Sequence, residues 1–249
     1  MASTLQGKIA LVTGASTGIG LGIARQFIAE GAHVFITGRR QKELDEAAKV
    51  LERNVTALRA DASNLDDLDR IYARIKADKG KLDIVVANAG GAEAQPLGQI
   101  TEEAFDKTFA TNVKGTLFTV QKALPLLGKG SSVILIGSTT SVTGLKNASV
   151  YGATKAAVRN FAKSWIQDLQ GSGIRINVLS PGPVRTPGLA GLAPQGQEQA
   201  LFDALAAQVP LGRIGEPDEI GKAAVFLASD SASFVHGVEF FVDGGQAQI

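Results

Sequence analysis

The chain has 249 residues, of which 45% are hydrophobic, and its formal net charge at pH 7 is +1. This length and composition suffice for one large α/β domain or two small ones, and the balanced charge argues against a nucleic-acid partner. The sequence has no cysteine, and its two histidines, His33 and His236, lie far apart, so neither disulfides nor a bound metal are expected.

The first residues, Met1 to Thr4, lack the basic and then apolar pattern of a secretory leader, and no apolar run approaches the length of a membrane span. We therefore expect a cytoplasmic protein that does not enter a membrane. Neither an internal repeat nor a linker is visible, so residues 1–249 are expected to form a single domain.

Short apolar runs alternate with longer amphipathic segments along the chain. Strands are predicted at residues 8–13, 33–37, 55–60, 82–87, 132–137, 174–179 and 238–242. Helices are predicted at residues 18–30, 40–53, 64–79, 101–127, 150–170 and 217–228. This alternation predicts an α/β fold of the Rossmann type, a doubly wound parallel sheet of about seven strands with helices on both faces.

Residues 8–20 combine a buried strand, a glycine turn and the start of a helix. Glycines let the backbone turn tightly and leave no Cβ between main chain and ligand, and the helix start presents unpaired N–H groups and its positive dipole end. This combination predicts a pyrophosphate site, although an ordinary strand–helix turn shows a similar pattern. The expected cofactor contacts here are Gly14, Ser16, Thr17, Gly18, Ile19 and Gly20.

The second predicted strand runs into Gly38, Arg39 and Arg40. In dinucleotide-binding folds this position lies beside the adenosine ribose, where an acidic side chain would accept a hydrogen bond from a free 2′-hydroxyl. Glycine occupies that position here, and guanidinium groups match a 2′-phosphate in charge and shape. Arg39 is therefore predicted to bind the phosphate of NADP(H), whereas for Arg40 a solvated place at the start of the next helix is an equal alternative.

Two further strand ends are expected to contact the cofactor. Asp61 and Ala62 follow the third strand, where the carboxylate would meet the adenine amino group or cap the next helix. Asn88, Ala89 and Gly90 follow the fourth strand, and their small size lets a ligand lie close to the backbone.

Ser138 follows the apolar fifth strand, and Tyr151 and Lys155 stand four residues apart on the next predicted helix. This spacing places the phenol and the ammonium on one helix face. A nearby ammonium lowers the pKa of a phenol, which is otherwise near ~10, and so prepares it for proton transfer. A tyrosine–lysine pair by itself is more often a surface pair, but the glycine turn and the strand-end serine favour catalysis.

Residues 181–216 are rich in proline and glycine and show no clear strand, so we predict a substrate lid at about residues 183–215. Charges are sparse there, which predicts a mostly apolar pocket for an uncharged ketone or secondary alcohol. Helix packing is the alternative explanation for some of the apolar side chains. The residues expected to shape the pocket are Glu93, Thr140, Leu145, Leu189, Leu192 and Phe202.

The motifs together carry a family resemblance. Their order and spacing resemble those of the classical short-chain dehydrogenases/reductases. The motifs are Thr13-Gly-x-x-x-Gly-Ile-Gly20, Asn88-Ala-Gly90, Asn112-Val-Lys-Gly115, Ser138, Tyr151-x-x-x-Lys155 and Pro181-Gly182. The sequence resembles the bacterial NADP-dependent ketoreductases and alcohol dehydrogenases of that family. It departs from many members at Ala87, usually asparagine, and from some NADP-dependent members at Thr17, which in those is basic.

The resemblance implies a mechanism without a metal. Tyr151 would donate a proton to the substrate carbonyl, Lys155 would lower the tyrosine pKa and bind the nicotinamide ribose, and Ser138 would polarise the carbonyl. Asn112 would lie at an interruption of a long helix and hold a water. The nicotinamide end would contact Pro181, Gly182, Val184 and Thr186.

The resemblance also implies a homotetramer, for which two helices offer apolar faces: Phe105, Phe109, Val113, Leu117 and Val120 on one, and Ala157, Phe161, Trp165 and Leu169 on the other. Burial of these faces against the protein's own sheet is the alternative. Two alternative functions remain open. One is a 3-oxoacyl-carrier-protein reductase, which needs basic residues near the entrance of its site to meet an acidic carrier. Lys129 is such a residue, but Ser172 stands where a second basic residue would be expected. The other is a nucleotide-binding sensor without turnover.

Overall fold

The structure is a computed structural model that describes residues 4–91 and 93–248. Within these residues, seven parallel strands form one sheet in the order β3-β2-β1-β4-β5-β6-β7. The strands are β1 (Ile9–Val12), β2 (His33–Gly38), β3 (Val55–Arg59), β4 (Ile84–Ala87), β5 (Ser132–Ile136), β6 (Arg175–Pro181) and β7 (Glu239–Val242). The strand order reverses direction between β1 and β4, and ligands bind at the carboxyl ends of strands at such a reversal.

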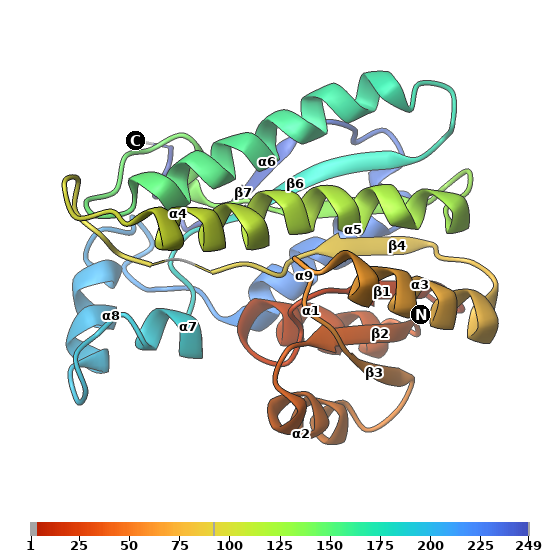
Figure 1. Ribbon diagram of the computed structural model, residues 1–249, viewed down its shortest axis with the longest axis horizontal. Helices are drawn as coiled ribbons and strands as arrows, with labels where there is room; N and C mark the ends of the chain where they lie inside the picture. The colour runs from red at the N-terminus through yellow and green to blue at the C-terminus, as the bar shows by residue number, and fades with distance from the viewer. Residues whose placement is uncertain (1–3, 92, 249) are drawn as a thin grey trace.

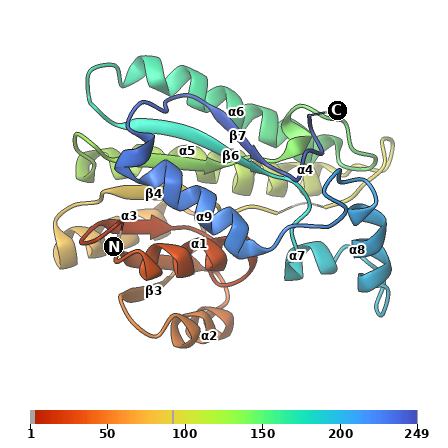
Figure 2. The same cartoon turned by 180° about the vertical axis from the view of Figure 1, so that it is seen from behind.

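Helices cover both faces of the sheet, as Figures 1 and 2 show from opposite sides. One face carries α1 (Gly18–Ala29), α2 (Gln41–Leu51) and α9 (Pro217–Ala228), and the other carries α3 (Leu65–Lys79), α4 (Glu102–Phe109), α5 (Gly115–Ala123) and α6 (Ser149–Asp168). The core is accordingly divided into two apolar clusters, one on each side of the sheet. The predicted single-domain, doubly wound α/β fold is confirmed.

The sequence marks several helix ends directly. Asn64 caps α3 by accepting hydrogen bonds from the amides of Asp66 and Asp67, and Gly80 ends that helix in the left-handed conformation. Pro217 occupies the first turn of α9, which begins with a capping box between Glu216 and Glu219.

The predicted helix at 101–127 is divided into shorter elements. α4 and α5 are separated by a π-helical turn, η1 (Ala110–Lys114), and a 3-10 turn, η2 (Leu124–Leu126), follows α5. The helical periodicity of the sequence did not locate the π turn. Such turns often occur at functional sites because they redirect side chains within an otherwise regular helix.

Residues 183–215 contain more regular structure than the predicted loop. Two short helices, α7 (Pro187–Ala190) and α8 (Glu198–Ala206), project beyond the edge of the sheet where β6 ends (Figure 1). A β-bridge between Val184 and Gly215 joins the two ends of this excursion. The segment is therefore a helical excursion whose two ends are paired with each other.

Candidate active site

The glycine turn between β1 and α1 fits tightly against the end of β4. Gly14 has a φ of +64°, and a Cβ placed there would lie 2.8 Å from the Cα of Ala89. Gly18 has a φ of +58°, and a Cβ there would lie 3.2 Å from the Cγ2 atom of Thr186. Side chains at either position would require a strained backbone and would separate the segments that meet here. The turn thus brings the start of α1, the end of β4 and the segment after β6 together.

Two polar side chains fasten this junction. The Thr13 Oγ1 atom accepts hydrogen bonds from the amides of Asn88 and Ala89, both at 3.0 Å. The Asn88 Nδ2 atom donates to the carbonyl oxygens of Thr13 at 2.8 Å and Gly14 at 3.0 Å. Thr13 is fully buried, and it was not among the cofactor contacts predicted from the sequence. In the structure, the Asn88 amide group holds the turn in place.

The start of α1 suits an anion. The N-cap residue, Thr17, makes no side-chain capping bond within the described residues, and the first turn contains no acidic residue. Ser16 lies close to the second strand end, since a Cβ at Gly38 would be 3.1 Å from the Ser16 Oγ atom. Unpaired helix N–H groups beside a hydroxyl group fit a dinucleotide pyrophosphate.

The structure brings Arg39 and Asp61 together at the carboxyl ends of β2 and β3. The Arg39 Nη1 atom lies 3.9 Å from the Asp61 Oδ2 atom, and the arginine side chain is 62% exposed. Such a long, exposed contact is weak, so the guanidinium group remains accessible to a ligand. Arg40 is paired instead with Glu43 on α2, at 3.0 Å, in keeping with the solvated alternative.

Asp61 does not cap α3, whose N-cap is Asn64. Its Oδ1 atom accepts hydrogen bonds from the Ser63 amide at 2.9 Å and the Ser63 hydroxyl at 2.7 Å. Ala62 is buried, with its carbonyl group against Gly115. The carboxylate of Asp61 therefore orders the turn after β3, and the helix-capping alternative is wrong, because Asn64 caps α3.

Ser138, Tyr151 and Lys155 converge beyond the end of β5. Ser138 begins a 3-10 turn, η3 (Thr139–Ser141), and its Oγ atom accepts hydrogen bonds from the amide and the hydroxyl group of Thr140. The Lys155 Nζ atom lies 5.5 Å from the centre of the Tyr151 ring and donates to the Ile136 carbonyl at 2.8 Å. One helix and one strand end thus position a phenol, an ammonium and a hydroxyl group side by side.

Burial controls the charges of this cluster. It raises the pKa of the Tyr151 phenol, which hydrogen bonding with Ser138 partly offsets. It lowers the pKa of Lys155 from 10.5 to about 8. We expected the ammonium to lower the tyrosine pKa, but here desolvation has the larger effect, and Lys155 is directed at a carbonyl group. The phenol is therefore protonated at neutral pH and is available as a proton donor.

The lysine shift predicts a pH dependence of stability. Between pH 8 and about pH 9.5, Lys155 is largely neutral in the folded protein but charged in the unfolded chain, which then binds more protons. Its contribution to the free energy of unfolding should therefore rise with pH, by about 1–2 kcal/mol over this range. Urea denaturation of the cofactor-free protein, compared with Lys155→Met, measures this difference. Parallel pH profiles for the two proteins would contradict it.

Asn112 lies in the π turn η1 and connects three segments. Its side chain is buried, donates to the Gly91 carbonyl at 2.9 Å and to the Thr154 hydroxyl at 3.0 Å, and accepts from the Gly91 amide at 3.0 Å. The Thr154 hydroxyl donates in turn to the Tyr151 carbonyl at 2.7 Å. Asn112 thus links the loop after β4 to the helix that carries Tyr151. Thr154 was not among the site residues predicted from the sequence.

The segment after β6 carries the four residues predicted to contact the nicotinamide end. Pro181 lies within β6, and Gly182 packs closely on Asp243. Val184 is 4% exposed and packs into the core. Thr186 caps α7 by accepting a hydrogen bond from the Leu189 amide. The Thr186 side chain remains beside Gly18, at the glycine turn.

The residues predicted for the substrate pocket are only partly brought together. Thr140 bonds to Ser138 and so lies at the cluster, whereas Glu93 pairs with Lys107 on α4 at 2.5 Å. Phe202 is buried beneath the guanidinium group of Arg185, whose Cζ atom lies 4.5 Å from the ring centre. Leu189 is half-buried, and Leu145 and Leu192 are exposed on separate loops.

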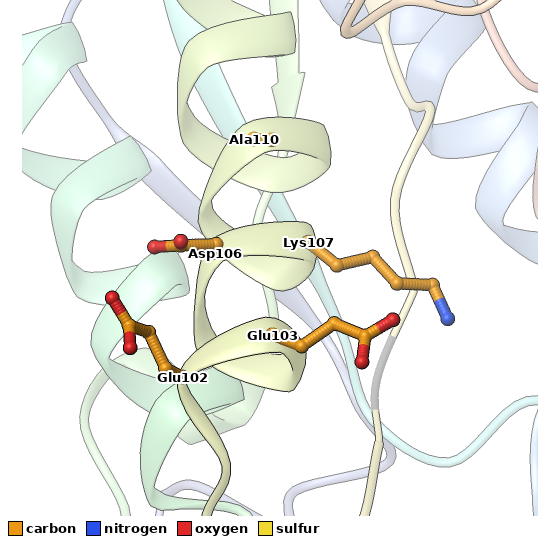
Figure 3. A pocket seen from close by; sticks show the side chains of 5 residues that line it. All are labelled: Glu102, Glu103, Asp106, Lys107 and Ala110. Atoms are coloured by element: carbon orange, nitrogen blue, oxygen red, sulfur yellow. The ribbon is translucent and has the colours of Figure 1, made fainter.

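The hollows of the surface do not identify this pocket. Glu93 contributes to a small one of about 10 Å³ between the loop before α4 and the start of α6. A broad open hollow of about 560 Å³ lies along α4, where Glu102 and Asp106 point to one side of the helix and Glu103 and Lys107 to the other (Figure 3). Neither is lined by Ser138, Tyr151 or Lys155.

Within residues 4–91 and 93–248, no grouping of three or more histidine, cysteine or acidic side chains would suit a metal ion. None of the helices in the same residues combines the length and the apolar character needed to cross a membrane.

Comparisons with known proteins agree with this arrangement. The sequence model of a family described as enoyl-(acyl carrier protein) reductase matches residues 14–247. Oxidoreductase asL5 of Sarocladium schorii is 51% identical over 247 residues, covering 98% of each chain. The 3-oxoacyl-[acyl-carrier-protein] reductase FabG of Thermotoga maritima is 32% identical, covering 97% of this chain and 98% of the relative.

Among solved structures, a short-chain dehydrogenase/reductase of Brucella melitensis, titled glucose/ribitol dehydrogenase, superposes with a TM-score of 0.89. It is 30% identical and covers 99% of both chains. Fold, motif order and relatives therefore lead to one conclusion: the chain is an oxidoreductase of the short-chain dehydrogenase/reductase family.

Proposed function

We propose that this protein is an NADP(H)-dependent oxidoreductase that interconverts small ketones and secondary alcohols. The observation that carries the proposal is the convergence of Ser138, Tyr151 and Lys155 around the end of β5. The glycine turn and the uncapped start of α1 support a dinucleotide at the same edge of the sheet. Arg39 supports the choice of NADP(H), because its guanidinium group is exposed beside the end of β2.

When bound by the start of α1 and Arg39, NADPH would supply the hydride that reduces the carbonyl carbon. The Ser138 hydroxyl group positions the carbonyl oxygen, and the Tyr151 phenol donates the proton that this oxygen gains. Lys155 holds a positive charge close to the phenol and stabilises the phenolate that proton transfer leaves. Asn112 holds Tyr151 and the loop after β4 in fixed relative positions through its hydrogen bond to Thr154.

A 3-oxoacyl-carrier-protein reductase is the second candidate, since the FabG relative covers nearly the whole chain. An acidic carrier would need basic residues near its docking place. Lys129 is exposed, but Ser172 occupies the position where a second basic residue would be expected. This composition favours a free ketone over a carrier-bound one. The intact tyrosine and lysine argue against a nucleotide-binding sensor without turnover.

A carbonyl panel tests these functions directly. Purified protein is incubated with NADPH or NADH and with aliphatic, cyclic and aromatic ketones, together with a carrier-bound oxoacyl thioester. We expect cofactor oxidation with one or more free ketones and faster turnover with NADPH. Reduction of the carrier-bound thioester alone would establish the second candidate. Cofactor binding without turnover on the whole panel would establish the sensor.

We further propose a homotetramer. Phe105 on α4 is 42% exposed and stacks on Phe109, so an apolar surface remains on that helix. Part of the predicted faces is used internally: Val120 is buried, and Phe161 and Trp165 pack on the protein's own core. Light scattering at micromolar concentration should give a mass near four times 25.8 kDa. A mass near one chain would exclude the assembly.

A further inference from the structure

A buried carboxylate on β7 connects three segments of the site. Glu239 is the first residue of β7, and its side chain is 9% exposed. The Oε1 atom accepts hydrogen bonds from the Ser141 hydroxyl at 2.5 Å and the Ser180 hydroxyl at 2.8 Å. The Oε2 atom lies 2.6 Å from the Nε atom of Arg159. Neither Glu239 nor Arg159 was singled out from the sequence.

Two of these partners belong to segments that carry a residue of the proposed mechanism. Ser141 ends the 3-10 turn η3, which begins at Ser138. Arg159 lies on α6, one helical turn beyond Lys155 and two beyond Tyr151. The β5–α6 loop and α6 are therefore both held to β7 by one carboxylate.

Ser180 gives the third connection. It is fully buried in β6, immediately before Pro181, and its side chain packs directly against Gly137, the residue before Ser138. The Glu239 carboxylate therefore fixes the position of the Ser138 loop relative to the sheet through two hydrogen bonds, one from Ser141 and one from Ser180.

The ion pair makes this arrangement sensitive to substitution. The Arg159 Nε and Glu239 Oε2 atoms are both completely buried, and neither has an aligned hydrogen-bond partner among the described residues. The Glu239 side chain is 9% exposed, whereas the rest of the Arg159 side chain reaches the surface and is 37% exposed. Replacing Glu239 therefore leaves the buried Arg159 Nε atom without its acceptor and also removes the acceptor of both serine hydroxyls, so the segments that they hold can shift.

We propose that Glu239 is a positioning residue that sets the distance between Ser138 and Tyr151. It holds the Ser138 loop through Ser141 and Ser180, and it holds α6 through Arg159. The inference rests on the proposed function, because it assigns Glu239 a role through Ser138 and Tyr151. Glu239 itself does not need to touch the substrate.

The test compares Glu239→Gln with a matched control, Asp83→Asn. Asp83 is also a largely buried carboxylate, which accepts from the Ile9 amide at 2.8 Å and pairs with Lys81 at 3.0 Å. It directly precedes β4 and so lies at the amino ends of the strands, opposite the carboxyl ends that carry the candidate site. We expect Glu239→Gln to lower kcat about 10- to 100-fold, because small displacements of reacting groups have effects of this size. Asp83→Asn should change kcat less than about 3-fold, even if it lowers the thermal midpoint as much.

Further measurements separate positioning from loss of folded protein. The substrate is the best ketone of the panel, NADPH affinity is measured by fluorescence titration, and NADPH deuterated at the transferred position gives the isotope effect on kcat. We expect NADPH affinity to stay within about 3-fold and the isotope effect to increase, because hydride transfer becomes slower than product release. A reduced fraction of folded enzyme would lower kcat and leave the isotope effect unchanged, and this result would overturn the proposal.

Two variants keep the test decisive. If Glu239→Gln does not fold, the neutral double variant Ser141→Ala/Ser180→Ala removes both hydroxyl links without burying a charge, and unchanged kcat in it would overturn the proposal. Wild type that reduces no carbonyl would overturn the proposed function and this inference together. Active wild type, inactive Tyr151→Phe and a fully active Glu239→Gln would overturn this inference alone.

Discussion

Replacing Tyr151 with phenylalanine should lower kcat for carbonyl reduction by about 10²–10⁴-fold, the usual contribution of general acid catalysis. The phenol is buried, and its raised pKa keeps it protonated at neutral pH. The neighbouring ammonium does not replace it, because Lys155 is directed at the Ile136 carbonyl. Steady-state kinetics with NADPH and the best ketone of the panel measure the loss.

The only other tyrosine provides a matched control. Tyr72 on α3 is buried, and its hydroxyl group donates to the Thr119 carbonyl. Tyr72→Phe removes a buried hydroxyl group at a place remote from Ser138, so it should affect stability and leave kcat within about 3-fold. Tyr151→Phe should in turn bind NADPH within a few-fold of wild type. A well-folded Tyr151→Phe protein with most of its activity would remove Tyr151 from the mechanism.

Replacing Gly38 with aspartate and Arg39 with leucine should reverse the cofactor preference from NADPH to NADH. A charge-assisted contact to the 2′-phosphate is worth about 1.5–3 kcal/mol, or one to two decades in affinity. The aspartate adds repulsion of the phosphate and an acceptor for the free 2′-hydroxyl group. The effect should lie in KM for the cofactor, because the phosphate is far from the transferred hydride.

The structure refines this experiment. A Cβ at Gly38 would lie 3.1 Å from the Ser16 Cβ and Oγ atoms, so the aspartate requires a small shift of Ser16. Arg39→Leu is therefore also made alone, and it should raise KM for NADPH about 10- to 100-fold. Arg40→Leu is its control, since Arg40 is paired with Glu43, and should have less than about a 3-fold effect.

The comparison of kcat/KM for both cofactors decides the assignment. Wild type that prefers NADH, or a double variant that still prefers NADPH, would show that Arg39 does not bind the phosphate. Equal effects of Arg39→Leu and Arg40→Leu would show a general effect of charge instead of a specific contact. Higher ionic strength should weaken the wild-type preference, because Arg39 is exposed to solvent.

The sequence by itself determined the strands of the sheet and the fold class, but not the π turn within residues 101–127 or the helices α7 and α8. Each of the seven predicted strands ends within two residues of its predicted bounds, because a buried parallel strand has a short apolar run in the sequence, bounded by turn residues. The glycine turn before α1 and the Tyr151–Lys155 spacing were equally visible, since both depend on residues close together in the chain. The fold and the family followed from these local patterns.

Only the tertiary structure decided what the polar side chains do. Asn88 donates hydrogen bonds to the glycine turn, and Asp61 accepts them from Ser63. Glu239 accepts hydrogen bonds from Ser180 and Ser141, which lie 59 and 98 positions away in the sequence. The pKa values of Tyr151 and Lys155 are set by burial, which depends on the packing of α6 against the sheet and not on their spacing. Periodicity and turn residues act over a few positions, whereas hydrogen bonds and desolvation depend on which distant segments the fold brings into contact.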